Sequence, residues 1–78
     1  MDKKEIRQLI NGYNLMDALE ARLQIVINGG VARSTIYKAF NQGANTPTLQ
    51  IIRREAEAVI KDHEDSVAAA LLAMEAAA

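Results

Sequence analysis

The stretch EARLQIVINGGVARSTIYKAFNQ, residues 20–42, decides the fold that we predict for this chain. Two segments with helical spacing of apolar residues flank a glycine pair that ends in Gly30. Glycine tolerates positive φ, so Gly30 allows two short helices to cross at a steep angle. Val31 is expected to fill the corner, and Ile36 and Ala39 to face back onto the preceding helix. The stretch therefore predicts a helix, a tight turn and a second helix.

The first helix of this stretch begins before residue 20. Asp17 is an acidic helix-start signal, so we expect this helix from about Leu15 or Asp17 to Ile27. The β-branched residues within 23–27 would also suit a β-strand, but no partner strand is visible elsewhere in the chain. We therefore predict a helix and keep the strand as the alternative.

The second helix of the stretch is expected over residues 33–42, with Gly43 at the position that follows its C-terminal cap. Its outward side is rich in side chains that can reach bases or phosphates, and it contains no acid. The candidate binding residues on this helix are Arg33, Ser34, Thr35, Tyr37, Lys38, Asn41 and Gln42.

Helix-start signals before and after this stretch predict two more helices. Asp2 with Glu5 three residues later is a capping-box-like pair, and apolar residues follow at helical spacing until Gly12. Thr46 supplies an N-cap, and Pro47 follows it at the first helical position. We therefore expect a short first helix and a final helix that begins at residue 47.

The final helix carries a long apolar stripe. Its members step by three or four residues: Leu49, Ile52, Ala56, Ile60, His63, Val67, Leu71 and Met74. The stripe keeps its phase throughout and would allow one helix from Pro47 to about Met74, but Asp65 followed by Ser66 is a second N-cap signal that could equally start a fifth helix. We favour a break or kink near residues 62–66 and keep the single helix as the alternative. Beyond residue 62 a small domain has no core left to cover, and the Ala-rich segment 67–78 is expected to meet a partner helix.

The formal net charge of −1 conceals an uneven distribution. No acid lies between Ala21 and Arg54, whereas residues 55–78 hold six acids and a single cation, Lys61. The cations of the acid-free segment are Arg22, Arg33, Lys38, Arg53 and Arg54. This asymmetry favours a surface that faces a polyanion, with a chance gap between acids as the alternative.

The segment GVARSTIYKAF, residues 30–40, resembles the helix-turn-helix of the phage-repressor and Cro-type DNA-binding family. The resemblance is close over about 22 residues and extends loosely into the 46–60 helix. In that family the second helix lies in the DNA major groove, which implies that residues 33–42 form the recognition helix here. Ala32 stands where the family usually has Ser or Thr as the N-cap, a difference that costs about 1 kcal/mol of capping.

The resemblance and the positions on the helix imply roles for these side chains. We expect Arg33 to contact either a guanine or a phosphate, and Lys38 to contact phosphate. Ser34 and Thr35, at the helix N-terminus, also suit phosphate, whereas Tyr37 suits either a thymine methyl group or simple packing. Further contacts to the DNA backbone are expected from Asn45, Thr46 and Thr48.

Several classes of function find no support in the sequence. The absence of cysteine excludes disulfides and thiolate chemistry, and we expect His63 to be a half-buried or surface side chain and not a metal ligand. No nucleophile triad, phosphate-binding loop or membrane span is evident, so we expect no enzyme, no cofactor, no small-molecule substrate and no membrane contact.

These observations predict an all-α bundle of four to five short helices that contains a helix-turn-helix and ends in an Ala-rich helix. We expect residues 1–63 to form the DNA-binding domain and residues 64–78 a helical extension that suits dimerisation. The expected function is that of a small transcriptional regulator that binds double-stranded DNA as a homodimer, in the cytoplasm at the nucleoid. The alternative is a helical protein-interaction module that does not bind DNA.

Overall fold

A computed structural model describes residues 2–42 and 45–77, and these residues form four helices and no strand. The helices are α1 (Lys3–Gly12), α2 (Met16–Val26), α3 (Arg33–Asn41) and α4 (Pro47–Ala77). The expected all-α class is confirmed, with four helices in the described part. The strand considered for 23–27 is not formed, because most of that segment is the last turn of α2.

The predicted helix starts at Asp2 and Thr46 are confirmed. The Asp2 carboxylate accepts a hydrogen bond from the Glu5 backbone N–H at 2.8 Å, and the Thr46 hydroxyl oxygen accepts one from the Leu49 N–H at 3.2 Å. Each bond satisfies a backbone donor that has no partner inside its helix. The local signals therefore placed the first residues of α1 and α4 correctly.

The connection between α2 and α3 is one residue longer than the predicted helix bounds imply, because α2 ends at Val26 and not at Ile27. It covers residues 27–32, where Gly29 and Gly30 have φ values of 86° and 73°. Val31 packs against the core, as expected for a residue that fills the corner. Ala32 precedes α3 in an extended conformation and gives no side-chain cap. At the other end of α3, the cap predicted at Gly43 lies outside the described residues.

The predicted break near residues 62–66 is wrong, because α4 runs without interruption from Pro47 to Ala77. Asp65 does not act as a cap. Its carboxylate lies 3.3 Å from the Lys61 ammonium, one helical turn earlier, and this pairing supports a continuous helix. The surrounding segment contains no glycine or proline that would end the helix.

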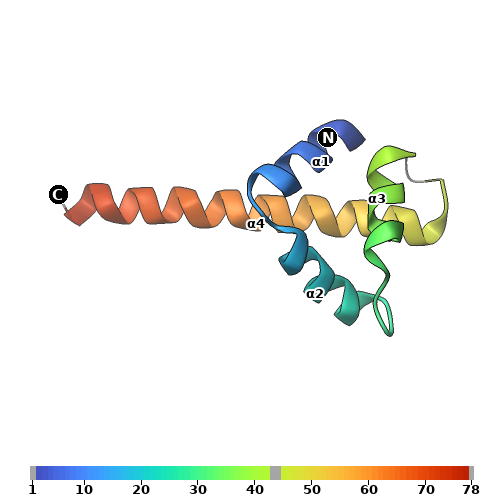
Figure 1. The fold of residues 1–78 in the computed structure, drawn as a ribbon. Coiled ribbons are helices and arrows are strands. Elements are labelled where there is room, and N and C mark those ends of the chain that lie inside the picture. Colours follow the sequence, from blue (N-terminus) through green and yellow to red (C-terminus); the bar gives the residue numbers. More distant parts are fainter. Residues whose placement is uncertain (1, 43–44, 78) are drawn as a thin grey trace.

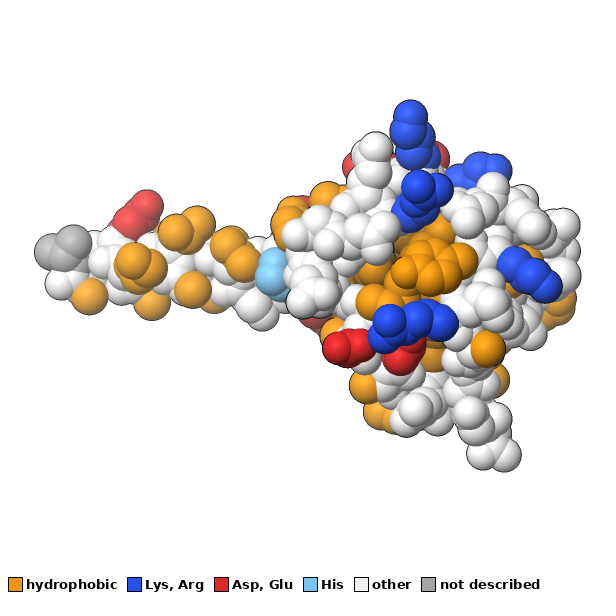
Figure 2. Space-filling view, viewed as in Figure 1, with side chains coloured by type: hydrophobic (Ala, Val, Ile, Leu, Met, Phe, Trp, Pro, Cys, Tyr) orange, Lys and Arg blue, Asp and Glu red, His pale blue; other side chains and the backbone are white. Residues whose placement is uncertain are grey.

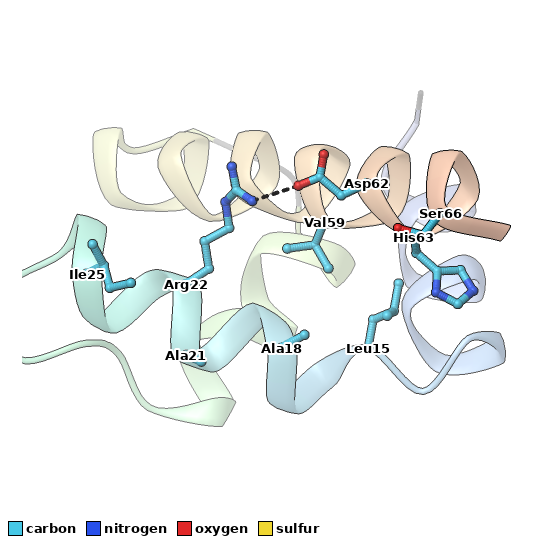
Figure 3. Close-up of a pocket in the computed structure, with 9 residues that line it drawn as sticks. All are labelled: Leu15, Ala18, Ala21, Arg22, Ile25, Val59, Asp62, His63 and Ser66. Atoms are coloured by element: carbon cyan, nitrogen blue, oxygen red, sulfur yellow. Dashed lines mark hydrogen bonds and ion pairs between the residues drawn. The ribbon is translucent and has the colours of Figure 1, made fainter. Parts of the chain in front are cut away.

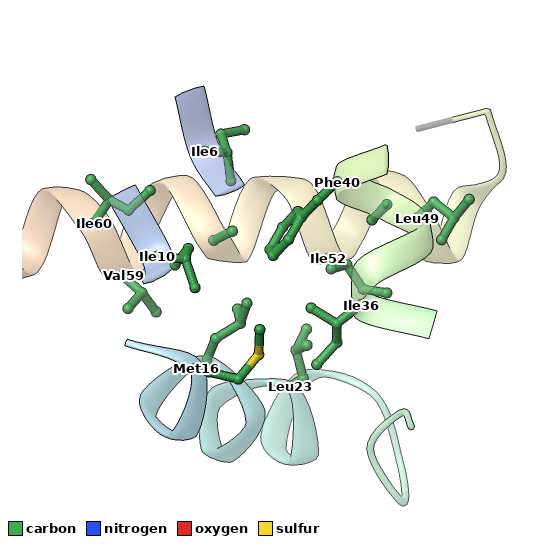
Figure 4. Packing of buried hydrophobic residues seen from close by; sticks show 13 residues of the cluster. Ile6, Ile10, Met16, Leu23, Ile36, Phe40, Leu49, Ile52, Val59 and Ile60 are labelled. Atoms are coloured by element: carbon green, nitrogen blue, oxygen red, sulfur yellow. The ribbon is translucent and has the colours of Figure 1, made fainter. Parts of the chain in front are cut away.

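One apolar core joins the four helices (Figure 4). α3 packs mainly against α4 and α1, and α2 packs mainly against α4. Ile36 and Ala39 are buried as predicted, but they face this shared core and not α2 alone. The buried residues are Ile6, Ile10, Met16, Leu19, Leu23, Ile36, Ala39, Phe40, Leu49, Ile52, Ala56, Val59 and Ile60.

The molecule has a head and a tail (Figure 1). We call residues 2–63 the head, in which α1, α2 and α3 cover the first half of α4. We call residues 64–77 the tail, the second half of α4, which extends beyond the other helices as a single helix. Its projection makes the molecule elongated, with extents of 48 × 25 × 17 Å.

Candidate nucleic-acid interface

The outward side of α3 is polar and accessible. Ile36, Ala39 and Phe40 anchor the helix in the core, which leaves the opposite side to solvent. The exposed residues of α3 and its C-cap are Arg33, Ser34, Tyr37, Lys38, Asn41 and Gln42, while Thr35 is half-buried. Asn45, Thr46 and Thr48 are also exposed where α4 begins. The structure therefore leaves the predicted binding residues accessible, apart from the partial burial of Thr35.

Arg33, at the start of α3, is engaged by two acids from α2. Its guanidinium donates hydrogen bonds to the Glu20 and Asp17 carboxylates, the latter at 2.9 Å. These contacts raise the pKa of Arg33, the hydrogen bond to Glu20 most of all. A phosphate or a base that approaches Arg33 must compete with both carboxylates.

Acids from outside the acid-free segment also reach two of its other cations. Arg22 bridges Glu55 and Asp62 on α4, with the Asp62 contact at 3.1 Å. Arg53 lies 3.8 Å from Glu57, one turn along the same helix. The acid-free segment of the sequence is therefore not an acid-free surface in the folded chain.

Lys38 and Arg54 are the two central cations that form no ion pair with the described residues. Lys38 stands on the exposed side of α3, one turn before Asn41. The Asn41 side-chain oxygen accepts a hydrogen bond of 2.9 Å from Arg7 on α1. This contact brings the cationic side of α1 next to the exposed side of α3.

Three cations of α1 contribute to this surface, and none of them was among the binding residues predicted from the sequence. Lys3 and Lys4 lie one turn before Arg7, so the three share one side of α1, and no acid pairs with them among the described residues. The net charge summed over a segment of sequence hid these cations, because acids close to them in sequence cancelled their positive charge in the sum. Those acids lie on other sides of the helices. The spacing of the cations, three and four residues, was the signal that could have found them.

We call the combined surface the basic face. It consists of Lys3, Lys4 and Arg7 of α1 with Ser34, Tyr37, Lys38 and Asn41 of α3. Figure 2 shows Lys and Arg side chains spread over the head on the side where α1 and α3 face the viewer. The acids that Figure 2 shows most clearly on this side of the head lie in its lower half, directly beside a Lys or Arg side chain.

A groove of about 420 Å³ lies between α2 and α4, away from the basic face (Figure 3). The Arg22–Asp62 ion pair spans it, and Ala18, Ala21 and Ile25 form much of its α2 side. His63, at one end, is half-buried as expected, and its ring lies 4.5 Å from that of Tyr13. Asp62 thus forms an ion pair with Arg22, and the His63 ring packs against Tyr13. Both contacts hold α4 against the other helices, so we assign the groove a structural role.

Comparisons of the chain with models of protein families, with curated proteins and with solved structures find no match. Within the described residues, no helix combines the length and the apolar character that crossing a membrane requires. The function is therefore inferred from the geometry and the charge of the surface.

Proposed function

We propose that the protein binds double-stranded DNA through the basic face, with α3 in the major groove and α1 beside the phosphates. The observation that carries the proposal is the position of Lys38. This cation, which has no acid partner among the described residues, stands on a polar helix side that Arg7, Lys3 and Lys4 flank. Phosphates attract such cations, and the major groove, about 12 Å wide, admits one α-helix.

The α2–α3 pair supports this proposal as a variant of a helix-turn-helix. α3 presents a polar side while its other side is fixed in the core, as a recognition helix requires. The connection over 27–32 is longer than the three- or four-residue turn typical of the motif, and Arg33 faces acids. Phosphate contact is therefore assigned first to Lys38 and α1, and base contact to Ser34, Tyr37 and Asn41.

Binding to a duplex of random sequence, measured by fluorescence anisotropy at several salt concentrations, tests the proposal. About four cations on phosphates predict a log–log slope of affinity against salt of roughly −3 to −4. Lys38→Ala should weaken binding several-fold and reduce the slope by about 1. Lys61→Ala is the matched control, because it removes the same charge from α4, where Lys61 pairs with Asp65.

Two outcomes would contradict DNA binding by this face. One is the absence of binding at 50 mM salt, and the other is an equal loss of affinity in Lys38→Ala and Lys61→Ala. A slope near zero would favour the second candidate function, a helical interaction module. That candidate draws support from the apolar side chains exposed on the tail, which are typical of protein contacts.

A transcriptional role follows only if binding is sequence-specific. We propose that the protein is a small regulator that acts at the nucleoid, because α3 offers polar side chains for base edges. Selection of bound duplexes from a random pool tests this step. An enriched common motif is the expected result. If no sequence were enriched, the protein would bind DNA without sequence preference.

A further inference from the structure

The tail exposes apolar side chains that the helices of the head leave uncovered. Val67, Leu71, Leu72 and Met74 are 45%, 55%, 66% and 69% exposed. Alanine fills every position between them, so another helix can approach closely. A contiguous apolar surface of this kind on a small protein marks a contact site.

Val67, Leu71 and Met74 lie on the same side of α4 as the head, whereas Leu72 lies on another side of the helix. Ile52, Ala56 and Ile60 are buried beneath α1, α2 and α3, and Val67 and Leu71 continue their stripe in steps of three or four residues. At the corner between head and tail lies a groove of about 280 Å³. It is lined by Tyr13, His63, Glu64, Val67, Ala68 and Leu71.

We propose that the tail binds the tail of a second copy of this chain, with the two helices antiparallel. In a parallel pair, each head would project from the contact side of α4 at the same height, and the two heads would occupy one space. In an antiparallel pair, each tail lies beside the other tail and ends at the corner groove of the other head. Both copies then use the same surface, as a two-fold dimer requires.

Charge favours the same arrangement. Lys61 and Glu75 are about four turns apart, so they lie on one edge of α4. Antiparallel pairing brings this edge of one helix against the same edge of the other, so Glu75 of each copy faces Lys61 of its partner. Glu75 has no ion-pair partner among the described residues, and Glu64, the carboxylate of the groove lining, accepts a hydrogen bond from the Tyr13 hydroxyl.

The charges of the tail do not suit a lipid surface. Its ionised groups are Glu64, Asp65 and Glu75, whereas helices that lie on anionic membranes carry Lys and Arg on their polar side. A second copy meets no such mismatch, because residues 66–74 are uncharged. The proposed dimer contact and the basic face are separate surfaces, because the tail shares no residue with the basic face.

Sedimentation equilibrium of the full chain from about 1 to 500 μM tests the dimer. The weight-average mass should rise from 8.5 kDa towards twice that value, since a short helix pair gives a modest affinity. Leu71→Lys should weaken the dimer at least tenfold and leave the helical circular dichroism unchanged, because Leu71 is exposed in the monomer. Ile25→Lys is the control, since Ile25 is 86% exposed on α2 and should leave the dimer intact.

A charge exchange tests the antiparallel orientation. Glu75→Lys should weaken the dimer roughly fivefold, and the double variant Lys61→Glu with Glu75→Lys should restore it. The two positions are too far apart within one chain, or across a parallel pair, for such a rescue. A wild-type mass of 8.5 kDa at every concentration, or a Leu71→Lys variant that dimerises as well as wild type, would overturn the proposal. If the protein stayed monomeric and bound vesicles of anionic lipid, the apolar stripe of the tail would be a membrane-binding surface.

Discussion

Gly30 is the glycine of the α2–α3 connection at which an added side chain would meet both a left-handed backbone and a close contact. Its φ of 73° lies in the left-handed region, and a Cβ added there would lie 2.9 Å from the Gln24 Cγ atom. Gly12 differs on both counts, because it ends α1 with a helical backbone and an added Cβ would meet nothing within 4 Å. The two glycines therefore form a matched pair for testing the α2–α3 connection.

Gly30→Ala should lower the free energy of unfolding by about 1–2 kcal/mol, the cost of a left-handed alanine. Gly12→Ala should raise the same free energy by up to about 1 kcal/mol, since alanine loses less backbone entropy on folding. Urea denaturation followed by circular dichroism measures both changes. Equal effects of the two substitutions would show that Gly30 does not have the described conformation.

Arg33 lies on α3, but Asp17 and Glu20 occupy its guanidinium. If the basic face binds DNA, removal of these two charges should release Arg33 for phosphate and also remove two repelling groups. The double variant Asp17→Asn with Glu20→Gln should therefore bind duplex DNA roughly tenfold more tightly at low salt. Anisotropy titration at 50 mM salt measures the gain.

The control for this gain is Asp62→Asn, which removes an acid that pairs with Arg22 and lines the groove between α2 and α4. A purely global charge effect would raise the affinity in the control as well, by about half as much on a logarithmic scale. An unchanged affinity in the double variant would place Arg33 outside the binding surface.

At the scale of the helices, local capping signals were sufficient to predict a helix start where a single side chain caps the helix. Asp2 and Thr46 were predicted from sequence and accept the bonds expected of them. Asp65 carries the same signal, yet its carboxylate pairs with Lys61 inside α4. A capping residue predicts a helix start only if nothing else competes for its side chain, and that competition depends on the neighbouring turn.

α3 begins without a side-chain cap, and this leaves a simple way to stabilise it. Ala32 already has the extended conformation typical of an N-cap, with φ −68° and ψ 151°, and is exposed. Ala32→Ser should therefore raise the free energy of unfolding by about 1 kcal/mol through a new hydrogen bond to a free backbone N–H of α3. Urea denaturation measures the gain, and Ala32→Val, which cannot cap, should show none.

The continuity of α4 at Ser66 can be tested with proline. In an unbroken helix, Ser66→Pro removes a backbone hydrogen bond and creates a clash one turn earlier, a cost of about 3 kcal/mol. The variant should lose ellipticity at 222 nm as the tail bends or frays, whereas Ser66→Ala should keep it. If Asp65 capped a separate helix, proline at its first position would be tolerated and both variants would match wild type.

At the scale of the whole molecule, the candidate surface was only partly predictable. The exposed side of α3 follows from periodicity, because buried Ile36, Ala39 and Phe40 leave the other positions outside. The acids near Arg33 and Arg22 and the cations of α1 depend on how separate helices pack. A charge count along the chain cannot contain that information, since packing sets which charges become neighbours.

The shape of the dimer gives the last prediction. The chain has a Cα radius of gyration of 14.1 Å, against roughly 11.5 Å for a compact domain of this length, because the tail projects. Antiparallel tails place the heads at opposite ends, so a particle from two 48 Å chains should reach roughly 75 Å after the tails overlap. Small-angle X-ray scattering at high concentration should show this length and a second maximum in the pair-distance distribution. A dimer no longer than about 50 Å would require the heads to lie side by side, and the steric argument for antiparallel tails would then fail.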